Sequence, residues 1–119
     1  MKKTLVLGAS THSYRYSHTA ANRLISRGIE VVLVGHTTGS IQGYPIHAHW
    51  PDDEDIHTVT MYLSVSNQIE YYDRILHSGI KRLIFNPGSE NIDLAAKARD
   101  AGIEVEEACT LVMLAANQY

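Results

Sequence analysis

The chain has 119 residues, of which 10 are Lys or Arg and 13 are Asp or Glu, and 45% of them are hydrophobic. This length predicts one domain, residues 1–119, with enough core to fold without disulfides or a metal. The formal net charge of −3, with basic residues scattered along the chain, argues against a nucleic-acid partner, because phosphate affinity comes from clustered Lys and Arg.

The sequence gives no sign of export or of membrane insertion. The only cysteine, Cys109, cannot form an internal disulfide, which favours a cytoplasmic location. The apolar run Leu5–Leu7 is too short for a signal peptide, and no run is long enough to span a bilayer. We therefore expect a cytoplasmic protein without a membrane partner.

β-Type runs alternate with helical spacing along the chain. We expect strands at Thr4–Gly8, Ile29–Val34, Thr58–Leu63, Arg82–Phe85 and Ile103–Glu106. The first, second and fourth of these are almost continuously apolar, which is typical of parallel strands covered by helices on both faces.

Three helical segments end at a glycine followed by isoleucine, at Gly28, Gly79 and Gly102. Such a glycine can adopt the left-handed conformation that closes a helix. Ser66 is the expected N-cap of the second helix, and the third helix follows Asn91. The apolar faces are expected at Ala21, Leu24 and Ile25, then at Ile69, Tyr72, Leu76 and Ile80, then at Leu94, Ala95 and Ala98.

The segment Thr37–Asp55 breaks the alternation, because two glycines, two prolines and an acidic run interrupt it. We predict a loop with one short strand around Tyr44–His47 in place of a full helix. The complete pattern predicts an α/β fold: a Rossmann-like, doubly wound parallel sheet of about five strands, in the order 3-2-1-4-5, with helices on both faces.

The first strand leads into a hydroxyl-rich loop, Gly8–His18. Small side chains before a helix N-terminus suit a phosphate or nucleotide, and Arg15 could add a bidentate contact. An ordinary capped turn is the alternative. A dinucleotide fits less well, because no second glycine follows Gly8 before Gly28 and no acidic residue follows Val34.

Polar turns also follow the third and fourth strands. Ser64–Asn67 follow one and Asn86–Asn91 the other. Pro87 and Gly88 favour a sharp turn that exposes backbone amides, although a turn that only restarts a helix has the same composition.

These features together resemble a known family. The segments that carry the resemblance are Gly8-Ala9-Ser10, Arg15-x-Ser17, the strand Glu30–Val34, Asn86-Pro87-Gly88 with Glu90-Asn91, and Ala101-Gly102-Ile103 running to Glu107-Ala108-Cys109. In their order and spacing they are similar to the small stand-alone coenzyme A (CoA)-binding proteins. These proteins are in turn similar to the N-terminal CoA-binding domain of the succinyl-CoA synthetase α subunit. The resemblance spans roughly Thr4–Leu114 and implies a Rossmann-like fold that binds CoA without an assigned reaction.

The resemblance also implies a set of ligand-binding residues. The phosphates would meet the first loop, the adenosine the turn after the second strand, and the pantetheine arm the turns after the third and fourth strands. The expected binding residues are Gly8, Ala9, Ser10, Arg15, Tyr16, Ser17, Gly35, His36, Ser64, Asn86, Pro87 and Gly88. Here Tyr16 stands where the family usually has Pro, and Gly35-His36 where it has Asn-Pro.

Other chemistry has weaker support. His47 and His49 lie in a loop without a metal-ligand motif, so we expect a solvated loop and no metal site. We expect a binding or regulatory module without its own catalysis. The alternative is an NAD(P)-dependent oxidoreductase or an acyl-CoA-processing enzyme that uses His12, His36 or Cys109. His18 also falls at this predicted edge. The apolar final helix around Leu111–Ala116 suggests a homodimer contact or a protein partner.

Overall fold

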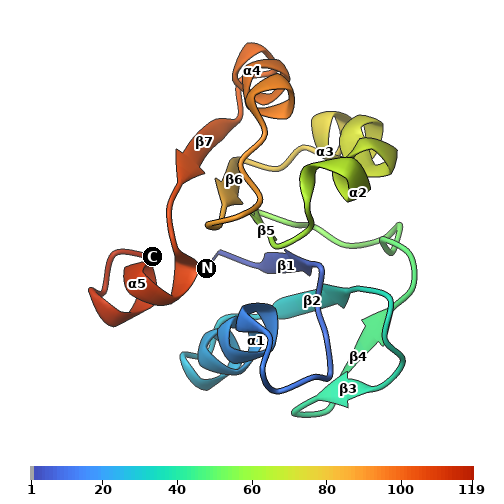
Figure 1. Cartoon of the computed structure of the whole chain (residues 1–119), viewed down its shortest axis with the longest axis vertical. Helices are drawn as coiled ribbons and strands as arrows, with labels where there is room; N and C mark the ends of the chain where they lie inside the picture. Colours follow the sequence, from blue (N-terminus) through green and yellow to red (C-terminus); the bar gives the residue numbers. More distant parts are fainter. Residues whose placement is uncertain (1) are drawn as a thin grey trace.

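The computed structural model describes residues 2–119 as one sheet with helices on both sides (Figure 1). The strands are β1 (Thr4–Leu7), β2 (Val31–Val34), β3 (Ser40–Ile41), β4 (Tyr44–His47), β5 (Thr58–Met61), β6 (Arg82–Phe85) and β7 (Glu104–Glu107). The helices are α1 (Tyr16–Ser26), α2 (Val65–Gln68), α3 (Tyr72–His77), α4 (Ile92–Asp100) and α5 (Thr110–Ala115), with the 3-10 helix η1 (Ile69–Tyr71) between α2 and α3.

The seven strands are ordered β3-β4-β2-β1-β5-β6-β7, and every pairing except that of β3 with β4 is parallel. The predicted doubly wound α/β fold is therefore confirmed. The predicted strand count and order are wrong in detail. The strand that starts at Thr58 pairs with β1, because the short strand β4 pairs with β2 and takes the position beyond it.

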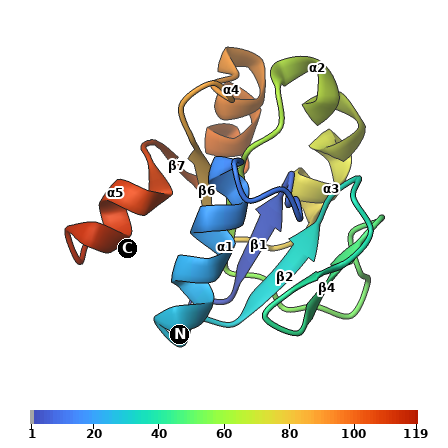
Figure 2. The same cartoon turned by 60° about the horizontal axis from the view of Figure 1, so that its bottom comes forward.

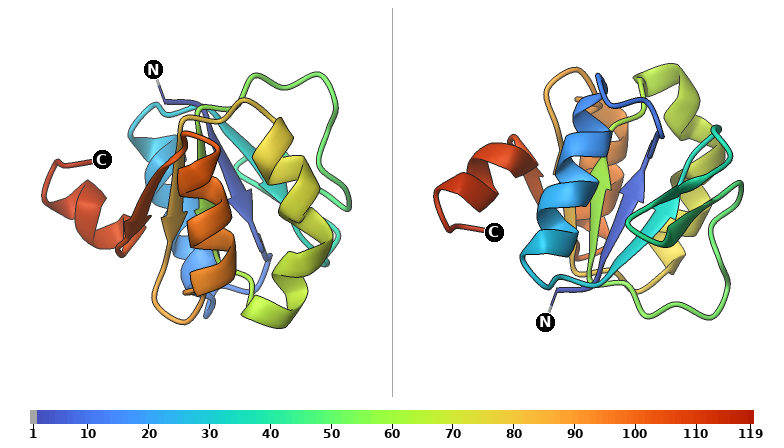
Figure 3. Two further views of the ribbon diagram at one scale, coloured as in Figure 1. Left: turned by 90° about the horizontal axis from the view of Figure 1, so that it is seen from above. Right: turned by 90° about the horizontal axis from the view of Figure 1, so that it is seen from below.

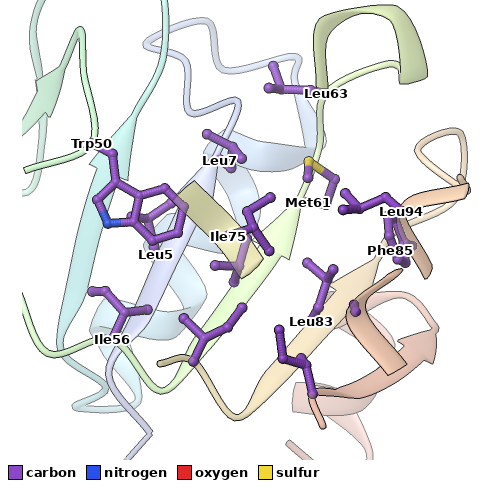
Figure 4. Packing of buried hydrophobic residues seen from close by; sticks show 14 of the residues in the cluster. Leu5, Leu7, Trp50, Ile56, Met61, Leu63, Ile75, Leu83, Phe85 and Leu94 are labelled. Carbon is purple, nitrogen blue, oxygen red and sulfur yellow. The ribbon is translucent and has the colours of Figure 1, made fainter. Parts of the chain in front are cut away.

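The helices divide into two layers (Figure 3). Segments α2, α3 and α4 cover one face of the sheet, and α1 covers the other. Between the sheet and the first layer lies a cluster of buried side chains from β1, β5 and β6, packed around Ile75 of α3 and Leu94 of α4 (Figure 4). On the opposite face, Val6 and Leu33 pack with Leu24 of α1 and Leu114 of α5.

The predicted helix endings are confirmed. Gly28, Gly79 and Gly102 follow their helices with φ of +75°, +82° and +83°, the left-handed conformation that glycine adopts without steric cost. The predicted buried face of α4, Leu94, Ala95 and Ala98, is also confirmed. Its N-cap is Asn91, whose Oδ1 atom accepts a hydrogen bond from the amide of Leu94.

The prediction for the middle helix was wrong in two respects. Ser64 is the N-cap residue in place of Ser66, and Ile69 is 64% exposed although it was assigned to the buried face. The segment divides into α2, η1 and α3. Because a 3-10 turn holds 3.0 residues and an α turn 3.6, it rotates the following side chains out of register with a continuous helix.

The last helix packs by one face only. Met113 and Leu114 are buried, whereas Val112 is 64% exposed. The guanidinium of Arg27 donates to the carbonyl oxygen of Leu114 at 2.5 Å and thus ties α5 to the end of α1. A subunit contact through α5 stays a prediction. Within residues 2–119, no helix has the length and apolarity needed to cross a membrane.

Candidate functional site

The parallel strands all point to one edge of the sheet, where α1, α2 and α4 begin (Figure 2). We call this edge the carboxyl rim; its loops are residues 8–15, 35–39, 62–64, 86–91 and 108–109. The winding direction changes between β1 and β5, whose last residues, Leu7 and Met61, are paired. Ligands of doubly wound sheets bind at such a switch point.

The first two loops of the carboxyl rim meet by their backbones. Gly8 turns the chain with φ of +102°, and the amides of Gly8 and Ala9 both donate to the carbonyl oxygen of Val34, at 2.8 and 2.9 Å. A β-carbon on Gly35 would lie 2.0 Å from the carbonyl oxygen of Ala9. Gly35 is therefore required so that the first loop can cross the end of β2.

Residues 10–12 of the first loop are held by hydrogen bonds within the loop, to α1 and to the loop after β2. The Oγ atom of Ser10 accepts from the amide of His12 at 3.0 Å, and Nδ1 of His18 lies 3.0 Å from the Ser10 carbonyl oxygen. The amide of Thr11 donates to Oγ1 of Thr37 at 3.2 Å. These bonds fix the loop against both α1 and the loop after β2.

Residues 12–16 of the first loop are exposed to solvent. Arg15 is the N-cap residue of α1, and no side chain caps the helix there. Tyr14 and Tyr16 are each 76% exposed; the Tyr14 ring stacks on His12 and lies 5.8 Å from the Arg15 guanidinium. Exposed cationic and aromatic groups thus stand at a helix N-terminus, which favours anions. Ser17, in contrast, is buried.

Asn86 is buried beneath the carboxyl rim, and its side chain joins three elements. Its Nδ2 atom donates to Oγ1 of Thr60 at 2.7 Å and to the carbonyl oxygen of Met61 at 3.0 Å. Its Oδ1 atom accepts from the amide of Thr110 at 2.8 Å. Both donor hydrogens of this amide are therefore used within the protein. The exposed residues of this loop are Pro87, Gly88 and Glu90.

Ser64 is exposed at the start of α2, and its hydroxyl accepts from Nδ2 of Asn67 at 3.1 Å. On the neighbouring loop, Gly88 has φ of +94° and its amide donates to Oε1 of Glu90 at 2.8 Å. The structure therefore brings the predicted residues of the third and fourth turns to the carboxyl rim together with the first loop.

Gln68 links the two turns, and sequence reasoning missed it. Its side chain is fully buried; Nε2 donates to the carbonyl oxygens of Leu63 and Ser89, both at 2.8 Å, and Oε1 accepts from Asn91 at 2.9 Å. Glutamine is normally exposed, and nothing in the local pattern marks this one. The contact joins positions 21 residues apart in sequence.

Two further groups lie beside the end of β5. Burial raises the pKa of Tyr62 to about 12, and its hydroxyl has no hydrogen-bond partner within the described chain. Cys109 is a half-buried free thiol at the N-cap of α5. The hydroxyls of the buried residues Thr60, on β5, and Thr110, the first residue of α5, are 2.8 Å apart.

Four of the other histidines are exposed. His12 and His36 are exposed at the carboxyl rim, and His47 and His49 are exposed along and after β4. Across residues 2–119, no three His, Cys, Asp or Glu side chains are grouped as metal ligands would be.

Two pockets, of about 210 and 260 Å³, are lined by residues outside the loops of the carboxyl rim. Lys3, Glu30 and Glu54 line the smaller one together with β2 and β4, and Lys2, Arg27 and Tyr119 line the larger. Neither pocket includes a predicted site residue.

The buried Arg82 guanidinium stacks on the Tyr119 ring, 4.3 Å from its centre. Burial and the positive charge of Arg82 lower the pKa of His57.

Solved structures share this fold. A crystal structure of an uncharacterized protein is 44% identical, with a TM-score of 0.95 over 100% of this chain and 98% of that one. Two less similar structures have the same fold. A protein from Thermus thermophilus is 19% identical, with a TM-score of 0.87 over 99% of this chain and 90% of that one. A hypothetical protein from Pyrococcus horikoshii OT3 is 22% identical, with a TM-score of 0.82 over 93% of this chain and 79% of that one. The curated proteins contain no match.

Residues 2–115 match the family described as CoA binding domain, which is nearly the whole chain. The chain therefore belongs to this CoA-binding domain family.

Proposed function

We propose that this chain is a single CoA-binding domain that holds CoA or an acyl-CoA along the carboxyl rim and has no catalysis of its own. The observation that carries the proposal is the family match over residues 2–115. The single free cysteine favours a cytoplasmic location for this module.

The phosphates belong on the first loop. Gly8 and Ala9 turn their backbone across the end of β2, and α1 begins without a side-chain cap. The uncapped N–H groups and the positive end of the helix dipole favour an anion. Arg15 is exposed beside them and supplies a charge-assisted contact to a phosphate.

The remainder of the ligand follows the carboxyl rim in both directions. The adenosine lies near Gly35 and His36, and the pantetheine arm runs past Ser64 towards Pro87 and Gly88, all of which are accessible. Asn86 contributes indirectly, since its side chain holds β5, β6 and α5 together beneath the arm.

Calorimetric titration of the purified chain with CoA, dephospho-CoA, NAD and NADP tests this proposal. We expect CoA to bind more tightly than either nicotinamide nucleotide. No heat and no thermal shift with millimolar CoA, together with a clear response to NADP, would contradict the proposal.

Arg15→Ala, with Arg23→Ala as a control for loss of an exposed charge on the same helix, tests the phosphate contact. Loss of a charge-assisted hydrogen bond predicts about tenfold weaker CoA binding for Arg15→Ala alone. A larger loss for CoA than for dephospho-CoA assigns Arg15 to the 3′-phosphate, and equal losses assign it to the pyrophosphate. An unchanged affinity removes Arg15 from the site.

A further inference from the structure

Large aliphatic side chains are exposed where α2 and α4 begin. Val65 is the first residue of α2 and is 44% exposed; Ile69, four residues on, is 64% exposed. Ile92, the first residue of α4, is 88% exposed. Both helices start at the carboxyl rim and lie on the same face of the sheet (Figures 2 and 3).

The two helix starts are fixed relative to each other. Buried Gln68 donates to the carbonyl oxygens of Leu63 and Ser89 and accepts from Asn91, so it joins the turn before Val65 to the turn before Ile92. Asn91 also donates to the Tyr72 hydroxyl at 2.8 Å. The exposed aliphatic groups therefore stand on a rigid support, which lowers the entropic cost of binding.

We propose that Val65, Ile69 and Ile92 bind the aliphatic acyl group of an acyl-CoA. This inference rests on the proposed function, in which the pantetheine arm runs past Ser64 and residues 86–88. Val65 directly follows Ser64, and Ile92 follows the second of these turns. The arm ends in the thiol that carries the acyl group, so an acyl chain leaving these turns reaches the aliphatic side chains next.

The charges of the same turns favour a neutral acyl group. Residues 63–68 and 86–91 contain no Lys, Arg or His, and their only charged residue is Glu90. The Glu90 carboxylate is held beside the arm by the amide of Gly88, and the neighbouring Asp93 pairs with Lys97 at 2.7 Å. A dicarboxylic acyl group would meet Glu90 without a cation in either turn, and like charges repel.

Calorimetric titration with CoA, hexanoyl-CoA and succinyl-CoA tests this inference. Partial burial of a six-carbon chain predicts about fivefold to tenfold tighter binding of hexanoyl-CoA than of CoA. Succinyl-CoA should bind no more tightly than CoA. Glu90→Gln should reduce the preference for hexanoyl-CoA over succinyl-CoA. Equal affinities for CoA and hexanoyl-CoA would overturn the inference and leave the proposed function standing.

Ile92→Ser locates the acyl group. Because Ile92 is almost fully exposed, this change should leave folding intact. We expect it to reduce the preference for hexanoyl-CoA by about threefold while the affinity for CoA is unchanged. Val112→Ser, on the exposed face of α5, is the matched control. A preference that survives Ile92→Ser in full would overturn the inference, and absence of binding by all three ligands would overturn the proposed function with it.

Discussion

Gly35 approaches Ala9 so closely that a β-carbon at position 35 would lie 2.0 Å from the Ala9 carbonyl oxygen. The backbone of Gly35 does not have a positive φ, so an alanine is excluded by this contact and not by conformation. The first loop can cross β2 at its observed position only while residue 35 lacks a side chain.

Gly35→Ala should therefore destabilise the fold by about 2 kcal/mol or more, as overpacking of a tight contact does. Urea unfolding measures this loss. Gly43→Ala is the control, because position 43 has open space but φ of +86°, for which about 1 kcal/mol is expected. Equal losses for the two variants would show that the first loop moves aside at little cost.

Gln68→Leu should lower stability by about 2–4 kcal/mol, because it leaves the Leu63 and Ser89 carbonyls and the Asn91 amide short of partners in a buried place. Thermal unfolding measures the change, with the exposed neighbour Glu70→Leu as control. A Gln68→Leu protein as stable as the parent would mean that these contacts contribute no net stability.

Tyr62→Phe should change the response of stability to alkaline pH. The pKa of Tyr62 is raised from 10.0 to about 12 by burial, so above pH 10 the unfolded state loses this proton before the folded state does. Stability that is complete below pH 10 is then lost as the pH rises towards 12. At pH 11, one unit above the pKa of the unfolded state, this loss of unfolding free energy is about 1.4 kcal/mol.

The Tyr62→Phe protein lacks that loss. The difference between its unfolding free energy and that of the parent should therefore shift by about 1.4 kcal/mol in favour of the variant between pH 8 and pH 11. Both proteins keep Tyr71 and Tyr119, whose pKa values burial also raises, so both lose some stability. A constant difference across this range would show that Tyr62 ionises as freely in the folded state as in the unfolded one.

Local pattern was sufficient for most of the fold. The apolar runs in β1, β2 and β6, and the glycines that close α1, α3 and α4, are signals carried by adjacent residues. The position of β5 was not predictable in this way, because it depends on β4 pairing with β2, a contact between distant segments. The 3-10 turn η1 likewise shifts the buried face in a manner that a periodicity of 3.6 residues cannot anticipate.

In the candidate site, too, the features carried by adjacent residues were predictable and those that depend on distant contacts were not. Its loops were predictable, since they follow strands that the sequence marks clearly. The functions of Gly35, Asn86 and Gln68 in holding those loops were not, because each acts on a residue more than 20 positions away. Whether Gly35 and Asn86 also contact a ligand stays a prediction.

The central claim, that CoA lies along the carboxyl rim, is tested most directly by amide chemical-shift changes during titration of ¹⁵N-labelled protein with CoA. We predict the largest changes at Gly8–Ser17, with further changes at Gly35, Ser64 and Gly88. Changes confined to Lys2, Arg27 and Tyr119, around the 260 Å³ pocket at the opposite edge, would contradict the claim.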